Sequence, residues 1–98
     1  MILVTGDVTA RADTIAEILR VSLEHVHRSR GEPGCISHDV AIDPENPLRL
    51  LFTERWADAA ALKVHFRVKA SQVMWKTLQE LAADPGAMHI YDASEIKL

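Results

Sequence analysis

The alternation of apolar and polar side chains at the start of the chain predicts a β-strand over residues 2–9. Its even-numbered positions are Ile2, Val4, Gly6 and Val8. Successive side chains of a strand point to opposite faces, so this strand has one strongly apolar face.

A helical pattern follows between residues 15 and 28. Asp13 suits the first turn of this helix, and His25 and Arg28 suit the last turn, because these charges complement the helix dipole. Gly31 and Pro33 are expected to end the helix. The positions that share its buried stripe are Ile15, Ile18, Leu19, Ser22 and Val26.

Two alternating segments, residues 36–42 and 48–56, predict a hairpin whose turn contains proline and asparagine. One face of this hairpin is expected to lie toward the helices. It holds His38 in the segment 36–42 and ends with Glu54 and Trp56 in the segment 48–56. The remaining members of that face are Ile36, Val40, Ile42, Leu48, Leu50 and Phe52.

The rest of the chain predicts two helices and a last strand. Residues 58–66 form a short helix with Asp58 as its N-cap, and residues 69–83 form a second helix that ends at a Pro-Gly pair. Residues 87–98 return to strand-like alternation. The order β-α-β-β-α-β predicts an α+β, ferredoxin-like single domain over residues 1–98, with helices on one face of a four-stranded antiparallel sheet.

The opposite face of this sheet is expected to hold Leu3, Thr5, Cys35, Leu51 and Thr53. Such a face is too apolar to remain in contact with water and too polar to be a deep core. We therefore expect a homodimer in which two sheets pack face to face.

Composition narrows the function classes. The 98 residues carry a net charge of −3, and the basic residues are scattered, which gives no electrostatic case for nucleic acid or an anionic membrane. Cys35 is the only cysteine, so neither an internal disulfide nor a cysteine zinc site can form. The N-terminus lacks the basic lead of a signal peptide, and a cytoplasmic location is expected.

Polar and aromatic residues interrupt the helix-facing side of the sheet. This pattern is typical of a small apolar pocket with a few polar groups. The residues that form it are His38, Glu54 and Trp56, together with the small Gly6. The letters Ser-His-Asp at 37–39 do not form a catalytic triad, because a strand sends the histidine to one face and its neighbours to the other.

Each of these residues also has a purely structural interpretation. His38 is then a satisfied, partly buried histidine, and Trp56 is core packing. Glu54 would pair with an arginine or lysine at the end of the sheet, and His65 would be an exposed helical residue. His25 and His27 are two residues apart on a helix and cannot share a metal ion, and no metal site is expected.

An ordered set of short motifs identifies a family. The motifs are Glu-Pro-Gly-Cys at 32–35, Asp-Pro at 43–44, Glu-Arg-Trp-x-Asp at 54–58 and Ala-Leu-x-x-His at 61–65. In this order and spacing they resemble the antibiotic biosynthesis monooxygenase (ABM) domain, in its small, stand-alone quinol monooxygenase form. The resemblance implies a dimeric α+β barrel.

The resemblance also implies an activity: oxidation of a quinol or related electron-rich aromatic by molecular oxygen, without metal, flavin or other cofactor. His65 or His38 would move a proton, and Trp56 would line the cavity. The implied substrate contacts are Phe52, Glu54, Met74 and Gly6. A non-catalytic small-molecule-binding dimer, or an isomerase of a small carbonyl compound, remains an alternative.

The chain departs from relatives at two informative positions. Many relatives carry a second histidine five residues beyond the position of His65, where this chain has Ala70. Relatives that degrade haem use an asparagine on the first strand, and the nearest equivalent here is Gly6, which argues against haem degradation.

Overall fold

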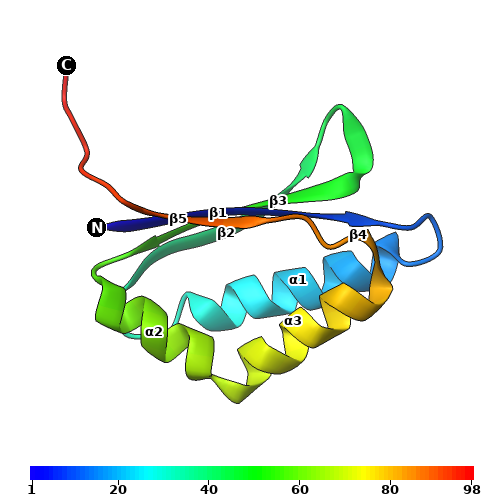
Figure 1. Ribbon diagram of the computed structural model, residues 1–98, viewed down its shortest axis with the longest axis horizontal. Coiled ribbons are helices and arrows are strands. Elements are labelled where there is room, and N and C mark those ends of the chain that lie inside the picture. The colour runs from blue at the N-terminus through cyan, green and yellow to red at the C-terminus, as the bar shows by residue number, and fades with distance from the viewer.

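The computed structural model describes residues 1–98 as one sheet with three helices on one of its faces (Figure 1). The helices are α1 (Ile15–Ser29), α2 (Ala59–Arg67) and α3 (Lys69–Leu81). The strands are β1 (Ile2–Ala10), β2 (Cys35–Asp43), β3 (Asn46–Trp56), β4 (Ala82–Asp84) and β5 (Met88–Asp92). No helix has the length and apolar content needed to cross a membrane.

The sheet is antiparallel throughout, and its strands run in the order β2-β3-β1, with β4 and β5 both paired to the free side of β1. The expected α+β, ferredoxin-like architecture is thus confirmed. Of the last strand, predicted over residues 87–98, only Met88–Asp92 is a strand, residues 93–98 have no regular structure, and the short strand β4 comes before it. Residues 82 and 83, expected in the preceding helix, belong to β4 instead, which pairs with β1 through Ala82 and Asp84. Pro85, which has no N–H to donate, lies between β4 and β5.

The even-numbered positions of β1 and β3 face the helices, as the alternation predicts. Val4, Val8 and Leu50 are buried there, and Trp56 has no exposed surface. From the helices, α1 and α3 pack Ile18, Met74 and Leu78 against Val8 and Leu50 to form the larger part of the core.

A β-bulge changes the predicted faces at the start of β2. Cys35 pairs with Trp56 and Ser37 pairs with Arg55, so Ile36 is an extra residue on this strand. Cys35 therefore packs on the helix side, against the cluster that contains Trp56, rather than on the opposite face where it was expected. Ile36, which was expected beside His38, is 57% exposed.

Helix starts follow the capping chemistry only in part. The Asp58 carboxylate accepts a hydrogen bond from Ala61 N at 2.9 Å, which confirms the predicted N-cap of α2. Asp13 lies before α1 rather than in its first turn. Thr14 occupies the N-cap position, and its hydroxyl donates to Leu81 O at 2.7 Å, which joins the start of α1 to the end of α3.

Gly34, in the turn before β2, has a conformation that only glycine adopts without strain. Its φ is +82°, and an added Cβ would lie 2.5 Å from Ala61 Cβ. We expect Gly34→Ala to lower the free energy of unfolding by about 1–3 kcal/mol in urea denaturation. Gly31→Ala is the matched control, because its Cβ would meet nothing closer than 3.6 Å. Equal stability of the two variants would contradict the described turn.

The sheet face away from the helices has no covering layer in the single chain (Figure 1). Leu3, Thr5, Leu51 and Thr53 are half-buried on it. Tyr91, which pairs with Leu3 across β1 and β5, is 49% exposed. This open face is the surface from which a homodimer was predicted.

Candidate functional site

A cavity of about 440 Å³ lies between the sheet and the helical layer. Helices α1 and α3, strands β1, β2 and β3, and the segment 85–88 provide its walls. Most of its lining is apolar, and the polar groups come from a few side chains. The lining residues used below are Gly6, His25, His38, Phe52, Glu54 and Met74.

Five of the seven residues predicted to form the site therefore line one cavity. The other two, Trp56 and His65, are fully buried and are not among the lining side chains. Both side chains lie next to Glu54, and their ring centroids are 4.6 Å apart. The expected role of Trp56 as a cavity wall thus differs from the structure, because its N–H is turned toward Glu54 and its ring packs with Val4 and Leu62.

Glu54 is a buried acidic residue in the wall of the cavity. It is 5% exposed, and its Oε1 accepts a hydrogen bond from Trp56 Nε1 at 2.9 Å. His38 Nε2 lies 3.2 Å from the same oxygen, close but poorly aligned for a hydrogen bond. The partners of Glu54 are therefore an indole and two histidines rather than the arginine or lysine that the sequence suggested.

The surroundings of Glu54 favour its charged form. Burial acts to raise the pKa of this carboxyl, but the contact with His38, the Trp56 N–H and the nearby His65 act in the opposite direction and prevail. The net effect is a pKa below the ordinary value of a glutamic acid. The cavity thus contains a buried carboxylate that accepts hydrogen bonds at neutral pH.

His65 is held by a second carboxylate. Its Nδ1 lies 2.8 Å from Glu32 Oε1, and because a carboxylate only accepts, the ring donates from Nδ1. In the neutral ring the lone pair is then on Nε2, which is buried, has no hydrogen-bond partner and lies 3.8 Å from Glu54 Oε1. The structure buries His65 completely, so its interpretation as an exposed helical residue is wrong.

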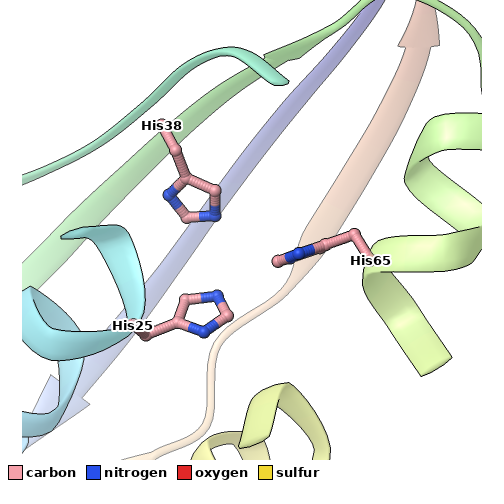
Figure 2. Close-up of side chains that lie close together, drawn as sticks. All are labelled: His25, His38 and His65. Atoms are coloured by element: carbon pink, nitrogen blue, oxygen red, sulfur yellow. The ribbon is translucent and has the colours of Figure 1, made fainter. Parts of the chain in front are cut away.

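His25 is the site residue that the sequence did not reveal. Figure 2 shows its ring facing those of His38 and His65, which come from β2 and α2. The three centroids lie 5.0, 5.2 and 5.5 Å apart. The sequence does contain a signal for its burial, because His25 follows Ser22 by three residues and so lies on the same buried stripe of the helix. The helix-dipole argument assigned it to the exposed last turn instead.

Arg28 determines which nitrogen of His25 carries the proton. Its Nη2 lies 2.7 Å from His25 Nδ1, and a guanidinium has no acceptor, so the arginine donates to Nδ1. In the neutral ring the proton is therefore on Nε2.

Burial also keeps His25 neutral. Desolvation lowers the pKa of His25 to about 3, with further contributions from His38, His65 and Arg28. The groups that face it are Arg28 on its own helix, His38 on β2 and His65 on α2, with Glu54 of β3 next to both histidines. No carboxylate offsets the burial of His25 directly.

The pKa of His25 predicts a pH dependence of stability. The unfolded chain protonates this imidazole as the pH falls through about 6.5, whereas the folded chain resists protonation down to about pH 3. Between these values the unfolded state binds one more proton, so stability falls as the pH falls. We expect His25→Gln to reduce that slope by about 1.4 kcal/mol per pH unit in urea denaturation between pH 6.5 and 4.5.

The exposed His27 provides the control for this measurement. It lies on the same helix, and His27→Gln is expected to leave the slope unchanged. Identical slopes for wild type and His25→Gln would show that the ring is not held neutral by burial.

The three histidines are close enough to raise the question of a metal site. One nitrogen of each lies within 4.8 Å of the others, and all three rings are buried. A metal needs a lone pair from each ring. His25 does not offer one toward the other two rings, because Arg28 occupies its Nδ1 and places the proton on Nε2.

Two further residues with side chains common in active sites lie outside the cavity. His89 pairs with Thr5 across β5 and β1, so it lies on the open face of the sheet and not in the layer beneath the helices. Asp39, whose neighbour is His38, forms an ion pair with Arg30 at 3.0 Å on the surface.

Comparison with known families matches residues 1–77 to the family described as antibiotic biosynthesis monooxygenase. Among curated proteins, an uncharacterised protein of Synechocystis sp. is 32% identical over 94 residues. The match covers 96% of this chain and 64% of that protein, so the chain spans less than two thirds of the length of this relative.

Solved structures agree in fold. An antibiotic biosynthesis monooxygenase crystal structure superposes with a TM-score of 0.88 at 25% identity, over 97% of this chain and all of that one. A candidate antibiotic biosynthesis monooxygenase of Deinococcus radiodurans gives a TM-score of 0.93 at 24% identity, over 100% of this chain and 97% of its own. At this level of identity the second match supports the fold alone.

Proposed function

Because this chain belongs to the antibiotic biosynthesis monooxygenase family, we propose that it oxidises a quinol or related electron-rich aromatic compound with molecular oxygen. The observation that carries the proposal is the buried Glu54 carboxylate in the wall of a mainly apolar cavity. The cavity volume, about 440 Å³, is within the range of small-molecule sites.

The chemistry balances without an external reductant. One hydroquinone and one O₂ give one hydroxyquinone and one water, so one oxygen atom enters the ring and the other leaves as water. All the electrons come from the substrate once a hydroxyl group has lost its proton. The protein then has to supply a proton acceptor, a site shielded from water and groups that stabilise the anion. No metal or flavin is required for this reaction.

The residues of the site divide these tasks. Glu54 accepts the hydroxyl proton, and His65 Nε2, which is buried without a hydrogen-bond partner 3.8 Å away, is the next acceptor. His38 and Trp56 hold the carboxylate in place from the side of the sheet. Phe52, Met74 and Gly6 form the apolar wall and leave room for an aromatic ring.

Oxygen uptake with a panel of benzo- and naphthohydroquinones tests this proposal. We expect uptake above the rate of autoxidation with at least one of them, and no added metal or flavin should be needed. Stabilisation of the protein against heat by a hydroquinone, with no uptake by any member of the panel, would instead identify a non-catalytic binder.

We further propose that the open face mediates a homodimer. The half-buried Leu51 and Thr53 on β3, and the exposed Tyr91 on β5 at the other side of β1, leave an apolar surface that a second copy would cover.

Light scattering at micromolar concentration is expected to give about 22 kDa, twice the 10.9 kDa of one chain. Leu51→Glu should reduce the mass to that of a monomer, because it places a charge within the covered face. Val64→Glu, on the exposed side of α2, should leave the mass unchanged. A wild-type mass near 11 kDa would contradict the proposed dimer.

A further inference from the structure

We propose that the inner end of the cavity is a subsite for an anionic aryl oxygen, and that the Nε2–H of His25 is its hydrogen-bond donor. The identity of the ligand as an aryl oxide rests on the proposed function. The existence of an oxyanion subsite rests on the geometry of the histidine cluster.

The first support is the direction of the proton. Arg28 donates to His25 Nδ1 at 2.7 Å, which leaves Nε2 as the protonated nitrogen. Figure 2 shows one nitrogen of this ring turned toward His38 and the other turned away from it. Since His25 also lines the cavity, a donor of fixed orientation lies at its wall.

The second support is the charge around the ring. His25 is neutral because it is buried, so it donates a hydrogen bond without giving up a proton. The Arg28 guanidinium behind it makes the Nε2–H more positive and hence a stronger donor to an anion. Arg28 Nε is itself buried without a hydrogen-bond partner, so one N–H donor of this cation has no acceptor.

The third support is the neighbouring acceptor. His25 and Glu54 both line the cavity, and His38 lies between them, with its ring centroid 5.0 Å from that of His25 and its Nε2 3.2 Å from Glu54 Oε1. A phenolic hydroxyl at this point donates to Glu54. When its O–H bond breaks, the proton forms a new O–H bond on the carboxylate, and the negative charge moves to the aryl oxygen.

The aryl oxide formed in this step needs a donor that was present before the charge developed. His25 meets this requirement, because its proton is on the correct nitrogen in the resting state and no reorganisation is needed. Removing one such preorganised donor lowers the rate of enzymes by roughly 10²–10³-fold.

The same geometry disfavours a metal ion as the occupant. A metal ion would need the lone pair of His25 Nε2, and Arg28 would first have to leave Nδ1. The cluster therefore offers a donor, His25, and a carboxylate acceptor, Glu54, that both neighbour His38, which suits a hydroxyl group that becomes an oxyanion.

Binding of 4-nitrophenol tests the subsite without turnover, because this phenol is not a quinol and its anion is visible by absorbance. We expect the wild-type protein to lower the pKa of the bound probe by about 1 to 2 pH units, the value of a hydrogen bond to a charged group. His25→Ala should abolish the shift. His25→Gln, whose amide N–H reaches a similar position, should restore part of it.

The controls separate structure from recognition. His27→Ala, on the exposed side of the same helix, should leave the probe pKa shift unchanged. Each variant is first checked for cooperative thermal unfolding. An equal shift in wild type and folded His25→Ala would overturn the proposal, as would failure of the wild type to bind the probe or stoichiometric binding of Zn²⁺ that is lost in His25→Ala.

The two proposals fail in different ways. A pKa shift of nitrophenol that depends on His25, together with no oxygen uptake from any hydroquinone, would support the subsite and refute the oxygenase. Oxygen uptake that is unaffected by His25→Ala would support the oxygenase and refute the role of His25.

Discussion

Replacing Glu54 with glutamine is expected to slow the oxidation of a hydroquinone by roughly 10²–10⁴-fold, the usual contribution of a positioned general base. Glutamine keeps the size of the side chain and an oxygen for Trp56 Nε1, but it cannot take a proton from the substrate. The rate of oxygen uptake at saturating hydroquinone measures the effect. Binding should change far less than turnover, since the apolar wall is intact.

Glu80→Gln is the matched control for this change, because Glu80 is an exposed glutamate on α3 outside the cavity lining. It should oxidise the substrate at the wild-type rate. If Glu54→Gln retained full activity while correctly folded, the carboxylate would not be the proton acceptor, and the assignment of roles within the cavity would have to be abandoned.

Trp56→Ala is expected to have the largest effect on stability, a loss of about 3–5 kcal/mol in the free energy of unfolding. The indole has no exposed surface and packs with Val4, Leu62 and the ring of His65. Its removal leaves a cavity and also deprives the buried Glu54 of its hydrogen-bond donor. Urea denaturation measures the change.

The second tryptophan, Trp75, provides the control. It separates the loss of the packing and hydrogen bond of Trp56 from the loss of any large side chain. Trp75 is only partly buried, so Trp75→Ala should cost less than Trp56→Ala. Trp56→Phe should be intermediate, because it fills most of the space but does not supply the N–H to Glu54. Equal losses for the two alanine variants would contradict the central position of Trp56.

The alternation of the strands is sufficient to predict the architecture and the part of the cavity wall that the sheet provides. Side-chain direction in a strand depends only on period, so Phe52 and Glu54 could be assigned to the helix side from sequence. The bulge at Ile36 could not be predicted in this way, because an extra residue in a strand leaves the local composition unchanged. That single residue reversed the predicted face of Cys35.

The histidine cluster was only partly predictable, for a different reason. His38 and His65 were recognised, one from a strand face and the other from a family motif. His25 was missed because its partners lie on other elements of the fold, and its own helix suggested a role at the dipole. The position of the proton on His25 depends on Arg28, which lies three residues further along the same helix and contacts Nδ1 of the ring.

Oxidation under ¹⁸O₂ tests the central claim most directly. With a hydroquinone that supports oxygen uptake, mass spectrometry of product and solvent should find one ¹⁸O atom in the hydroxyquinone and one in water. Labelled peroxide with an unlabelled quinone would show two-electron oxidase chemistry instead. That result, or the absence of any enzyme-dependent label, would contradict monooxygenation in the cavity beside Glu54.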